Sequence, residues 1–160
     1  MSDKALLQQK ILAQLTADQD LLLQSARAAH AEATDEQNKA ENKYDTRALE
    51  ASYLAQGQSR QALQTAQAIQ QFEALEVREF SDGDPIGLGA LVELQSGPEH
   101  GFYFMGPAAG GMEIDHCPGP VWVLTPYSPL GQQLMSRKKG DCWKTQIGRK
   151  SVQSVILGVF

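Results

Sequence analysis

The segment TDEQNKAENKYDTR, residues 34–47, joins two runs of sequence that favour α-helix. These runs, residues 6–33 and 43–75, are rich in Ala, Leu and Gln and contain one glycine, Gly57, and no proline. Two such helices with a short polar connection pack as an antiparallel hairpin. At about 1.5 Å per residue, arms of about 30 residues would reach about 45 Å. The sequence therefore predicts an N-terminal coiled-coil hairpin, residues 1–79, with an acidic tip at residues 34–47.

Apolar residues recur at helical spacing along both runs, which indicates faces that need a partner. One narrow stripe on each of two long helices suits a two-stranded antiparallel coiled coil. The predicted contact positions are Ile11, Leu15, Leu22, Ala26, Ala29 and Ala33 in the first run, and Leu49, Tyr53, Leu63, Ala66, Ile69 and Phe72 in the second.

The composition changes at the breaker cluster SDGDP, residues 81–85. Every glycine except Gly57, and every proline, lies after residue 80. Ser128 is the predicted N-cap of a short helix over residues 129–137, with Pro129 at its first position. The fold class is therefore α+β: the hairpin is followed by a small, mostly antiparallel β domain with one short helix, residues 80–160. Its predicted strands are 88–94, 101–105, 121–124, 142–147 and 152–160.

Charge is distributed unevenly behind a net value of −5. Residues 81–136 hold six acids and no Lys or Arg, whereas residues 137–150 hold six bases and one acid. Autonomous nucleic-acid binding needs a dominant basic surface and is not expected. A small basic cluster suits docking on an acidic face of another protein. Without a long apolar run or a paired-cysteine framework, the sequence predicts a cytoplasmic protein that does not cross a membrane.

The run SPLGQQLMSRKKGD, residues 128–141, resembles the C-terminal signature of the bacterial Gre-type transcript cleavage factors, GreA and GreB. That signature has Ser-Pro, a small residue, a Leu-rich turn, a basic pair and Gly-Asp. The runs GLGALV, residues 87–92, and YFMGP, residues 103–107, resemble two strands of the same family. The resemblance implies an FKBP-like β domain that docks on RNA polymerase while the hairpin enters the secondary channel. The docking residues that it implies are Ser128, Pro129, Leu130, Arg137, Lys138, Lys139 and Asp141.

In that family, acidic tip residues help to hold a polymerase Mg²⁺ during cleavage of backtracked RNA, which is chemistry that metal ions assist. The tip carboxylates here are Asp35, Glu36, Glu41 and Asp45. Asn38 stands at the Asp position of the family's Asp-x-x-Glu-Asn motif, so stimulation of cleavage stays open. Asn38 with Glu41 also fits a capping box, and Asp45 also fits an ordinary helix-face charge.

The resemblance thus implies a monomeric regulator of transcription elongation whose partner is RNA polymerase. It would have no catalytic residue, metal or cofactor of its own, and at most would stimulate the polymerase's cleavage activity. One alternative is a regulator that occludes the channel or modulates initiation without cleavage, as DksA does. A second, of a different class, is an FKBP-like peptidyl-prolyl isomerase. A third is a coiled-coil adaptor with no link to polymerase.

Overall fold

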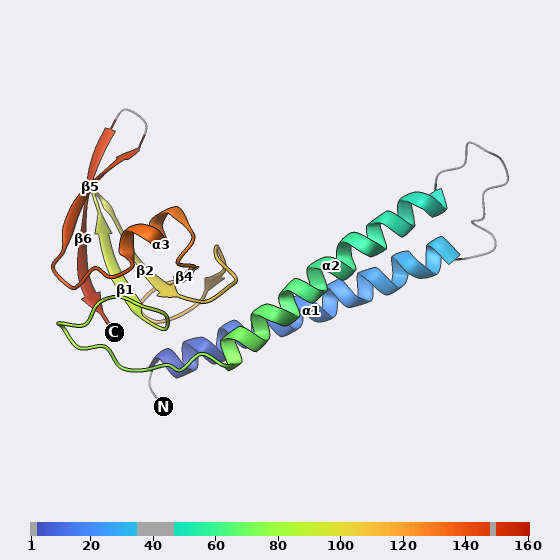
Figure 1. Ribbon diagram of the computed structural model, residues 1–160, viewed down its shortest axis with the longest axis horizontal. Helices are drawn as coiled ribbons and strands as arrows, with labels where there is room; N and C mark the ends of the chain where they lie inside the picture. The colour runs from blue at the N-terminus through green and yellow to red at the C-terminus, as the bar shows by residue number, and fades with distance from the viewer. Residues whose placement is uncertain (1–2, 35–46, 148–149) are drawn as a thin grey trace. The chain divides into compact units, whose positions relative to one another are not determined.

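The computed structural model describes residues 3–34, 47–147 and 150–160 (Figure 1). The chain forms two compact units, one made of Met1–Ile11 with Gln71–Phe160 and the other of Leu12–Gln70. The observed layout is α+β, as predicted. Its elements in chain order are α1 (Asp3–Thr34), α2 (Arg47–Glu73), β1 (Leu91–Ser96), β2 (Glu99–Met105), β3 (Glu113–Ile114), β4 (Val121–Leu124), α3 (Pro129–Leu134), β5 (Cys142–Ile147) and β6 (Lys150–Val159).

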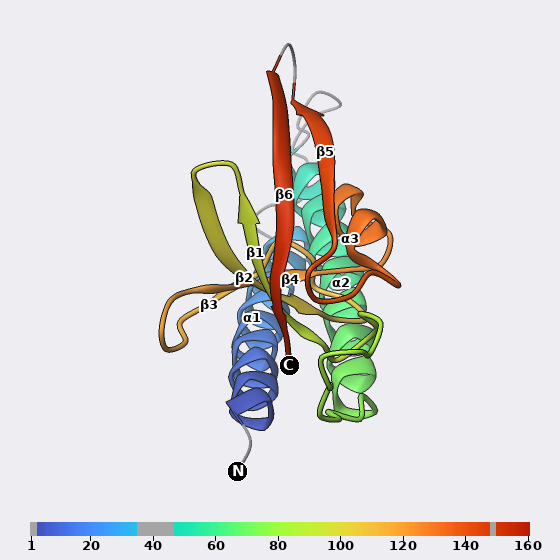
Figure 2. The same ribbon diagram turned by 90° about the vertical axis from the view of Figure 1, so that its left-hand side faces the viewer.

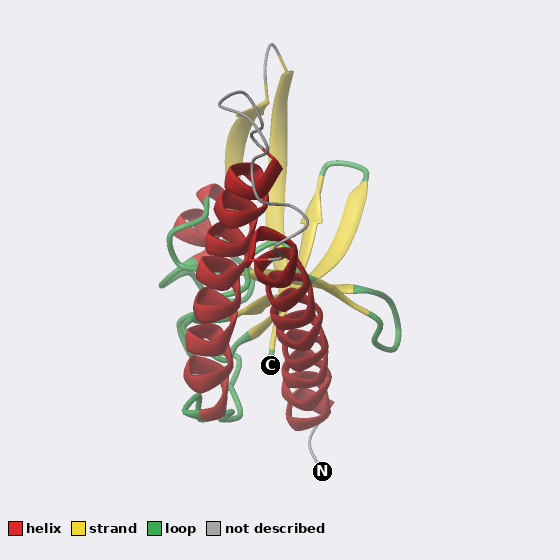
Figure 3. Ribbon diagram, turned by 90° about the vertical axis from the view of Figure 1, so that its right-hand side faces the viewer, coloured by secondary structure: helices red, strands yellow, loops and turns green. Residues whose placement is uncertain are grey.

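The two predicted helical runs are confirmed as α1 and α2. Within the second unit they lie side by side in both views (Figures 1 and 3). Four of the contact positions predicted in the first run are buried, namely Ile11, Leu15, Ala26 and Ala29, and Leu22 is half-buried. Ala33 is not among the positions whose side chains are described.

Three of the contact positions predicted in α2 are wrong. Leu49, Tyr53 and Leu63 are 53%, 64% and 61% exposed. The other three predicted positions, Ala66, Ile69 and Phe72, are buried or half-buried. Nearer the start of the helix, smaller side chains such as Ala55 and Ala62 are buried instead. The spacing of the inward row alternates between three and four residues, which is the repeat that a two-stranded coiled coil needs. Coiled-coil pairing itself stays a prediction. The row consists of Ala55, Gln58, Ala62, Thr65, Ile69 and Phe72, all buried or half-buried.

The sheet has strand order β3-β4-β2-β1-β6-β5 among the described residues (Figure 2). Its pairs are antiparallel except β2 with β4, which run parallel, so the predicted mostly antiparallel sheet is confirmed. The strands at 121–124 and 142–147 have their predicted bounds. The first strand starts at Leu91 and not at residue 88, because Gly89 takes a φ of 81° and turns the chain. The two-residue strand β3 was not predicted.

Successive residues of β1 point to opposite faces of the sheet. Val92 and Leu94 belong to the core cluster, to which α3 contributes Leu134. Phe104 of β2 packs against Phe72 at the end of α2, with ring centroids 6.5 Å apart. Both rings are fully buried, so apolar packing joins the end of α2 to the sheet.

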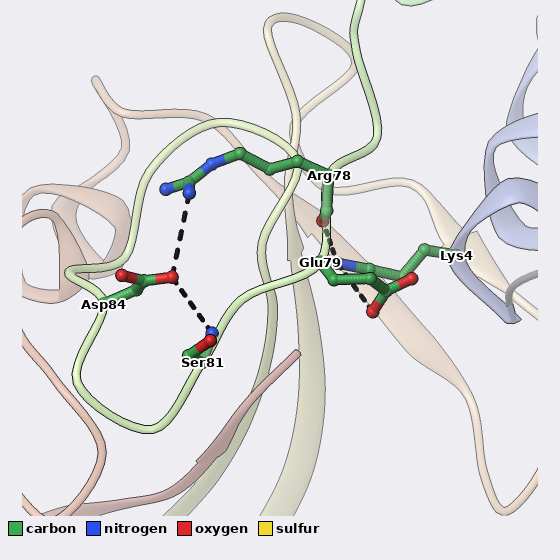
Figure 4. A network of polar contacts seen from close by, with 5 residues as sticks. All are labelled: Lys4, Arg78, Glu79, Ser81 and Asp84. Atoms are coloured by element: carbon green, nitrogen blue, oxygen red, sulfur yellow. Dashed lines mark hydrogen bonds and ion pairs between the residues drawn. The ribbon is translucent and has the colours of Figure 1, made fainter.

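The first turns of α1 are bound to the segment that follows α2 (Figure 4). The Lys4 ammonium, 3% exposed, donates a hydrogen bond to the Arg78 carbonyl and lies 3.8 Å from Glu79 Oε2 and 4.9 Å from the Phe80 ring centroid. Gln8 Nε2 donates to carbonyls at the end of α2 at 2.6 and 2.9 Å.

The domain boundary predicted after residue 79 follows the change in composition. The compact units follow packing, which groups the start of α1 with the sheet.

No helix in the described part of the chain is long and apolar enough to cross a membrane. The same residues contain no cluster of three or more His, Cys, Asp or Glu side chains that could hold a metal ion.

Candidate functional site

The start of α3 is fixed by its cap, as the sequence predicts. Ser128 has extended backbone, and its Oγ accepts a hydrogen bond from Gly131 N at 3.0 Å. The same hydroxyl donates to the Thr125 carbonyl at 2.8 Å. A Cβ on Gly131 would collide with that carbonyl oxygen, so only glycine fits. Cap and glycine together hold the helix against the loop that precedes it.

The helix ends at Leu134 and not at Arg137, which corrects the predicted end. The reason is local: Ser136 adopts a φ of 67°, which cannot continue a right-handed helix. Its N–H donates to the Ile86 carbonyl, and the Ile86 N–H donates to the Arg137 carbonyl at 2.8 Å. The basic residues therefore follow the helix in a loop that is bonded to neighbouring backbone.

An open groove of about 720 Å³ runs along α3 and this loop. The predicted docking residues Pro129, Arg137 and Asp141 all line it. Its remaining lining is mostly polar, so the groove suits hydrogen bonding and charge pairing more than burial of an apolar ligand. Those other residues are Gln132, Gln133, Met135 and Ser136.

Arg137 is held in one position by two neighbours. Its Nε donates to the Gln133 carbonyl at 2.5 Å, and its guanidinium carbon lies 4.5 Å from the centroid of the Trp143 ring. Trp143 Nε1 in turn donates to Gln133 Oε1 at 2.8 Å. This Arg137–Trp143–Gln133 cluster fixes the guanidinium before any partner arrives, which reduces the ordering cost of binding.

Asp141 closes a tight turn at the end of the groove. Its Oδ2 accepts from Lys138 N at 2.8 Å, and its own N–H donates to the Lys138 carbonyl at 3.0 Å. Gly140, with a φ of 87°, supplies the left-handed backbone that this turn requires. Hydrogen bonds to both the N–H and the carbonyl of Ile156 attach the turn to β6. Asp141 thus shapes the loop in addition to lining the groove.

The other two bases differ in their surroundings. Lys139 Nζ lies 2.9 Å from Oδ1 of Asp82, which belongs to the breaker cluster at residues 81–85. Lys138 is exposed, and its ammonium has no ion pair within the described ranges. Lys138 and Arg137 are therefore the cations of this cluster that are best placed to meet an acidic partner.

Of the seven predicted docking residues, Pro129, Arg137 and Asp141 line the groove, and their docking role stays a prediction. Leu130 packs against the core cluster, and Ser128 caps the helix. Gln133 and Trp143 were not predicted as part of the site. Gln133 lies four residues before Arg137, a spacing that places the two on one side of a helix. This spacing is a weak sequence signal that Gln133 belongs to the site. No sequence signal connects Trp143 to the helix.

The predicted tip residues Asp35, Glu36, Glu41 and Asp45, with Asn38, lie outside the described residues.

Comparison with known proteins gives distant likenesses. No family model matches the chain, and no curated protein matches it. The solved structures that resemble it include GreA factor homolog 1 (Gfh1) of Thermus thermophilus, at 17% identity over 96% of this chain and 94% of that one, with a TM-score of 0.37. A structure described as the transcription factor Gfh1 matches at 17% identity, 95% and 92% coverage and a TM-score of 0.39. Gfh1 of Thermus aquaticus matches at 15% identity, 94% and 92% coverage and a TM-score of 0.37.

Proposed function

We propose that this chain is a Gre-type regulator that binds RNA polymerase in the cytoplasm as a monomer. In this proposal, residues 128–141 dock on the polymerase, and the tip at residues 34–47 enters its secondary channel. The observation that supports it most is that the signature resembling Gre factors folds into one groove. All residues that line this groove come from the signature, including Pro129 at the start of the Ser128-capped helix and the ordered Arg137.

The groove suits an acidic partner surface. Arg137 is already ordered by Trp143 and Gln133, and Lys138 is free of ion pairs within the described ranges. Charge complementarity of this kind raises association rates and selects the partner. Since the adjoining residues 81–136 carry only acidic charges, free nucleic acid would be repelled from that part of the β domain.

The tip carboxylates Asp35, Glu36, Glu41 and Asp45 are proposed to act on an Mg²⁺ ion that the polymerase holds. Two carboxylates with water and phosphate oxygens are a common Mg²⁺ environment. The chain itself would carry no catalysis. With Asn38 at the family's Asp position, the proposal covers regulation of elongation, and experiment must decide between assisted cleavage and channel occupancy.

Binding to purified core polymerase tests the docking surface. An Arg137→Glu variant, which reverses the cation that lines the groove, is expected to weaken binding at least tenfold. Lys144→Glu is the matched control, because it reverses an exposed base on β5 outside the groove, and it should change binding by less than about threefold. Equal losses in both variants would show that only net charge matters and would contradict the proposed groove.

Cleavage in backtracked elongation complexes tests the tip. If a Glu41→Ala, Asp45→Ala double variant keeps binding but loses cleavage, the chain is a cleavage cofactor. If the wild-type chain binds and does not promote cleavage, it occupies the channel or modulates initiation. Absence of binding would overturn the Gre-type proposal.

The groove along α3 does not favour a prolyl isomerase. None of the residues that line the groove along α3 is aromatic, whereas a proline-binding pocket needs aromatic walls. A proline-peptide isomerisation assay is expected to show no activity above background.

A further inference from the structure

A second cavity, of about 490 Å³, lies on the sheet within the unit that contains β1 and β2. Its lining includes Leu91 and Glu93 of β1 and Phe102 of β2, the cross-strand partner of Glu93. Because Val92 and Leu94 point to the core cluster with α3, their neighbours Leu91 and Glu93 face the other way. This cavity is therefore distinct from the groove proposed for docking.

The floor of the cavity is apolar and aromatic. Leu91 is buried, and Phe160 is bonded to it through backbone hydrogen bonds of 2.9 and 3.0 Å in both directions. Phe102 and Phe160 add two rings to the lining. A short aliphatic chain would find apolar contact here, and an attached cation would be attracted by the faces of the rings.

The walls carry more negative than positive charge. Glu93 Oε1 accepts a hydrogen bond from His100 Nε2 at 2.8 Å, and no hydrogen bond is found to Glu93 Oε2 among the described residues. Glu79, 74% exposed, is a second carboxylate of the lining. The Lys4 ammonium is almost fully buried and is bonded to the Arg78 carbonyl (Figure 4). The partners of the Lys4 ammonium are thus the Arg78 carbonyl and the Glu79 carboxylate, 3.8 Å away.

His116 supplies a polar atom without a partner. Its Nδ1 is buried and makes no hydrogen bond to any described residue, although the residue lines the cavity. A buried polar atom in this condition is unfavourable, and a bound group that completes its hydrogen bond would be stabilised in return. In the tautomer that carries its proton on Nε2, Nδ1 is an acceptor.

We propose that this cavity binds a guanidinium or alkylammonium group carried on a short aliphatic chain. The cation donates hydrogen bonds to Glu93 Oε2 and His116 Nδ1, while the chain packs on Phe102 and Phe160. Anionic ligands are disfavoured by the two carboxylates. The cation has two possible sources, a free small amine or the side chain of an arginine or lysine on a partner protein.

Titration of the full chain with agmatine, followed by amide and imidazole NMR shifts, tests the site. The expected result is saturable binding with shifts around Glu93 and His116. Glu93→Gln should weaken the affinity about tenfold, since it removes a charged acceptor. His116→Leu should weaken it several-fold, and Lys4→Met should strengthen it by removing a like charge.

The matched control is Glu99→Gln, an exposed carboxylate of the same hairpin that does not line the cavity. It should change agmatine affinity by less than about twofold. Pentanoate, which carries one negative charge on a four-carbon chain, should not bind. Unsaturable agmatine shifts, equal losses in Glu93→Gln and Glu99→Gln, or pentanoate binding as tightly as agmatine would each overturn the proposal.

A parallel titration with acetyl-arginine amide distinguishes the two sources. Equal affinity for this compound and agmatine assigns the cavity to a side chain of a partner protein, whereas binding of agmatine alone assigns it to a free amine. Glu79→Gln, at an exposed position, gives a second lining variant if Glu93→Gln fails to fold. It should weaken agmatine binding about threefold, and an unchanged affinity would count against the proposal.

Discussion

Arg137 and Trp143 stack across the end of α3, with the guanidinium carbon 4.5 Å from the indole centroid. The two residues are joined a second time through Gln133, which accepts from Arg137 Nε through its carbonyl and from Trp143 Nε1 through its side chain. A cation in the proposed docking surface is thereby attached to the sheet through β5.

Trp143→Leu should lower the free energy of unfolding by about 1–2 kcal/mol, because it removes the cation–π contact with Arg137 and the hydrogen bond from Trp143 Nε1 to Gln133 Oε1. It should also weaken polymerase binding, because Arg137 loses its orientation. Urea unfolding measures the first effect and a binding titration the second. Lys144→Met, in the same strand but outside the groove, is the control. If Trp143→Leu binds polymerase as the wild type does, orientation of Arg137 is not needed.

Gly131→Ala should destabilise the sheet unit by about 1–3 kcal/mol, because the new Cβ would overlap the Thr125 carbonyl and force α3 to shift. Gly119→Ala is the matched control, since a Cβ there meets nothing within 4 Å. It should be neutral or slightly stabilising. Thermal unfolding of both variants measures the difference, and similar melting temperatures would contradict the close fit of α3.

Phe72→Ala should cost about 3–5 kcal/mol of unfolding free energy, because it removes a fully buried ring that packs against Phe104. Leu63→Ala should cost less than about 0.5 kcal/mol, since Leu63 is exposed. Denaturant unfolding of the two variants tests the inward face of α2 directly. A large loss of unfolding free energy in Leu63→Ala would show that Leu63 is a contact position, as the sequence predicted.

Lys4 should make stability depend on pH in the alkaline range. Burial lowers the pKa of its ammonium below the ordinary 10.5, and Arg78 lowers it further, while Glu79 opposes the shift. The unfolded chain then holds more protons than the folded one between the lowered pKa and 10.5, so stability rises with pH there. Lys4→Met should lack this rise.

This slope is best measured by denaturant unfolding from about pH 8 to pH 10. Above that range Tyr103 acts in the opposite direction, since burial, with Glu99 nearby, raises the pKa of its phenol above 10.0. A phenol that stays protonated longer in the folded chain makes stability fall as pH rises. Lys10→Met removes an exposed lysine from the same helix and serves as the control. If the wild type and Lys4→Met give parallel profiles, the burial of Lys4 has no energetic effect.

Much of the fold could be predicted from the sequence because its signals are local. Short β-type runs bounded by turn residues define β4 and β5 at 121–124 and 142–147. Ser128 followed by Pro129 defines the start of α3. The end of α3 was not predictable in this way, because the left-handed backbone at Ser136 depends on its hydrogen bond to Ile86. Likewise, no local pattern indicates that β2 and β4 pair in parallel.

The inward face of α2 was predicted at Ile69 and Phe72 and missed nearer the start of the helix. Large apolar residues suggested the stripe, but in α2 Ala55, Ala62 and Ala68 are buried. Side-chain size alone does not decide which face is covered. For the docking groove, the sequence indicated the basic loop through its resemblance to a family signature. It could not indicate Trp143, whose contact with Arg137 exists only once β5 lies beside α3.

The hydrogen bond from Lys4 to Arg78 spans 74 positions of the chain. During synthesis, α1 therefore leaves the ribosome well before the carbonyl that its lysine needs, and the sheet follows later still. The start of α1 can reach its final packing only when most of the chain has been made, which is a long-range closure of the kind that slows folding. Removal of the first few residues, or a bulky fusion directly before them, should consequently harm the last step of assembly more than the formation of either long helix.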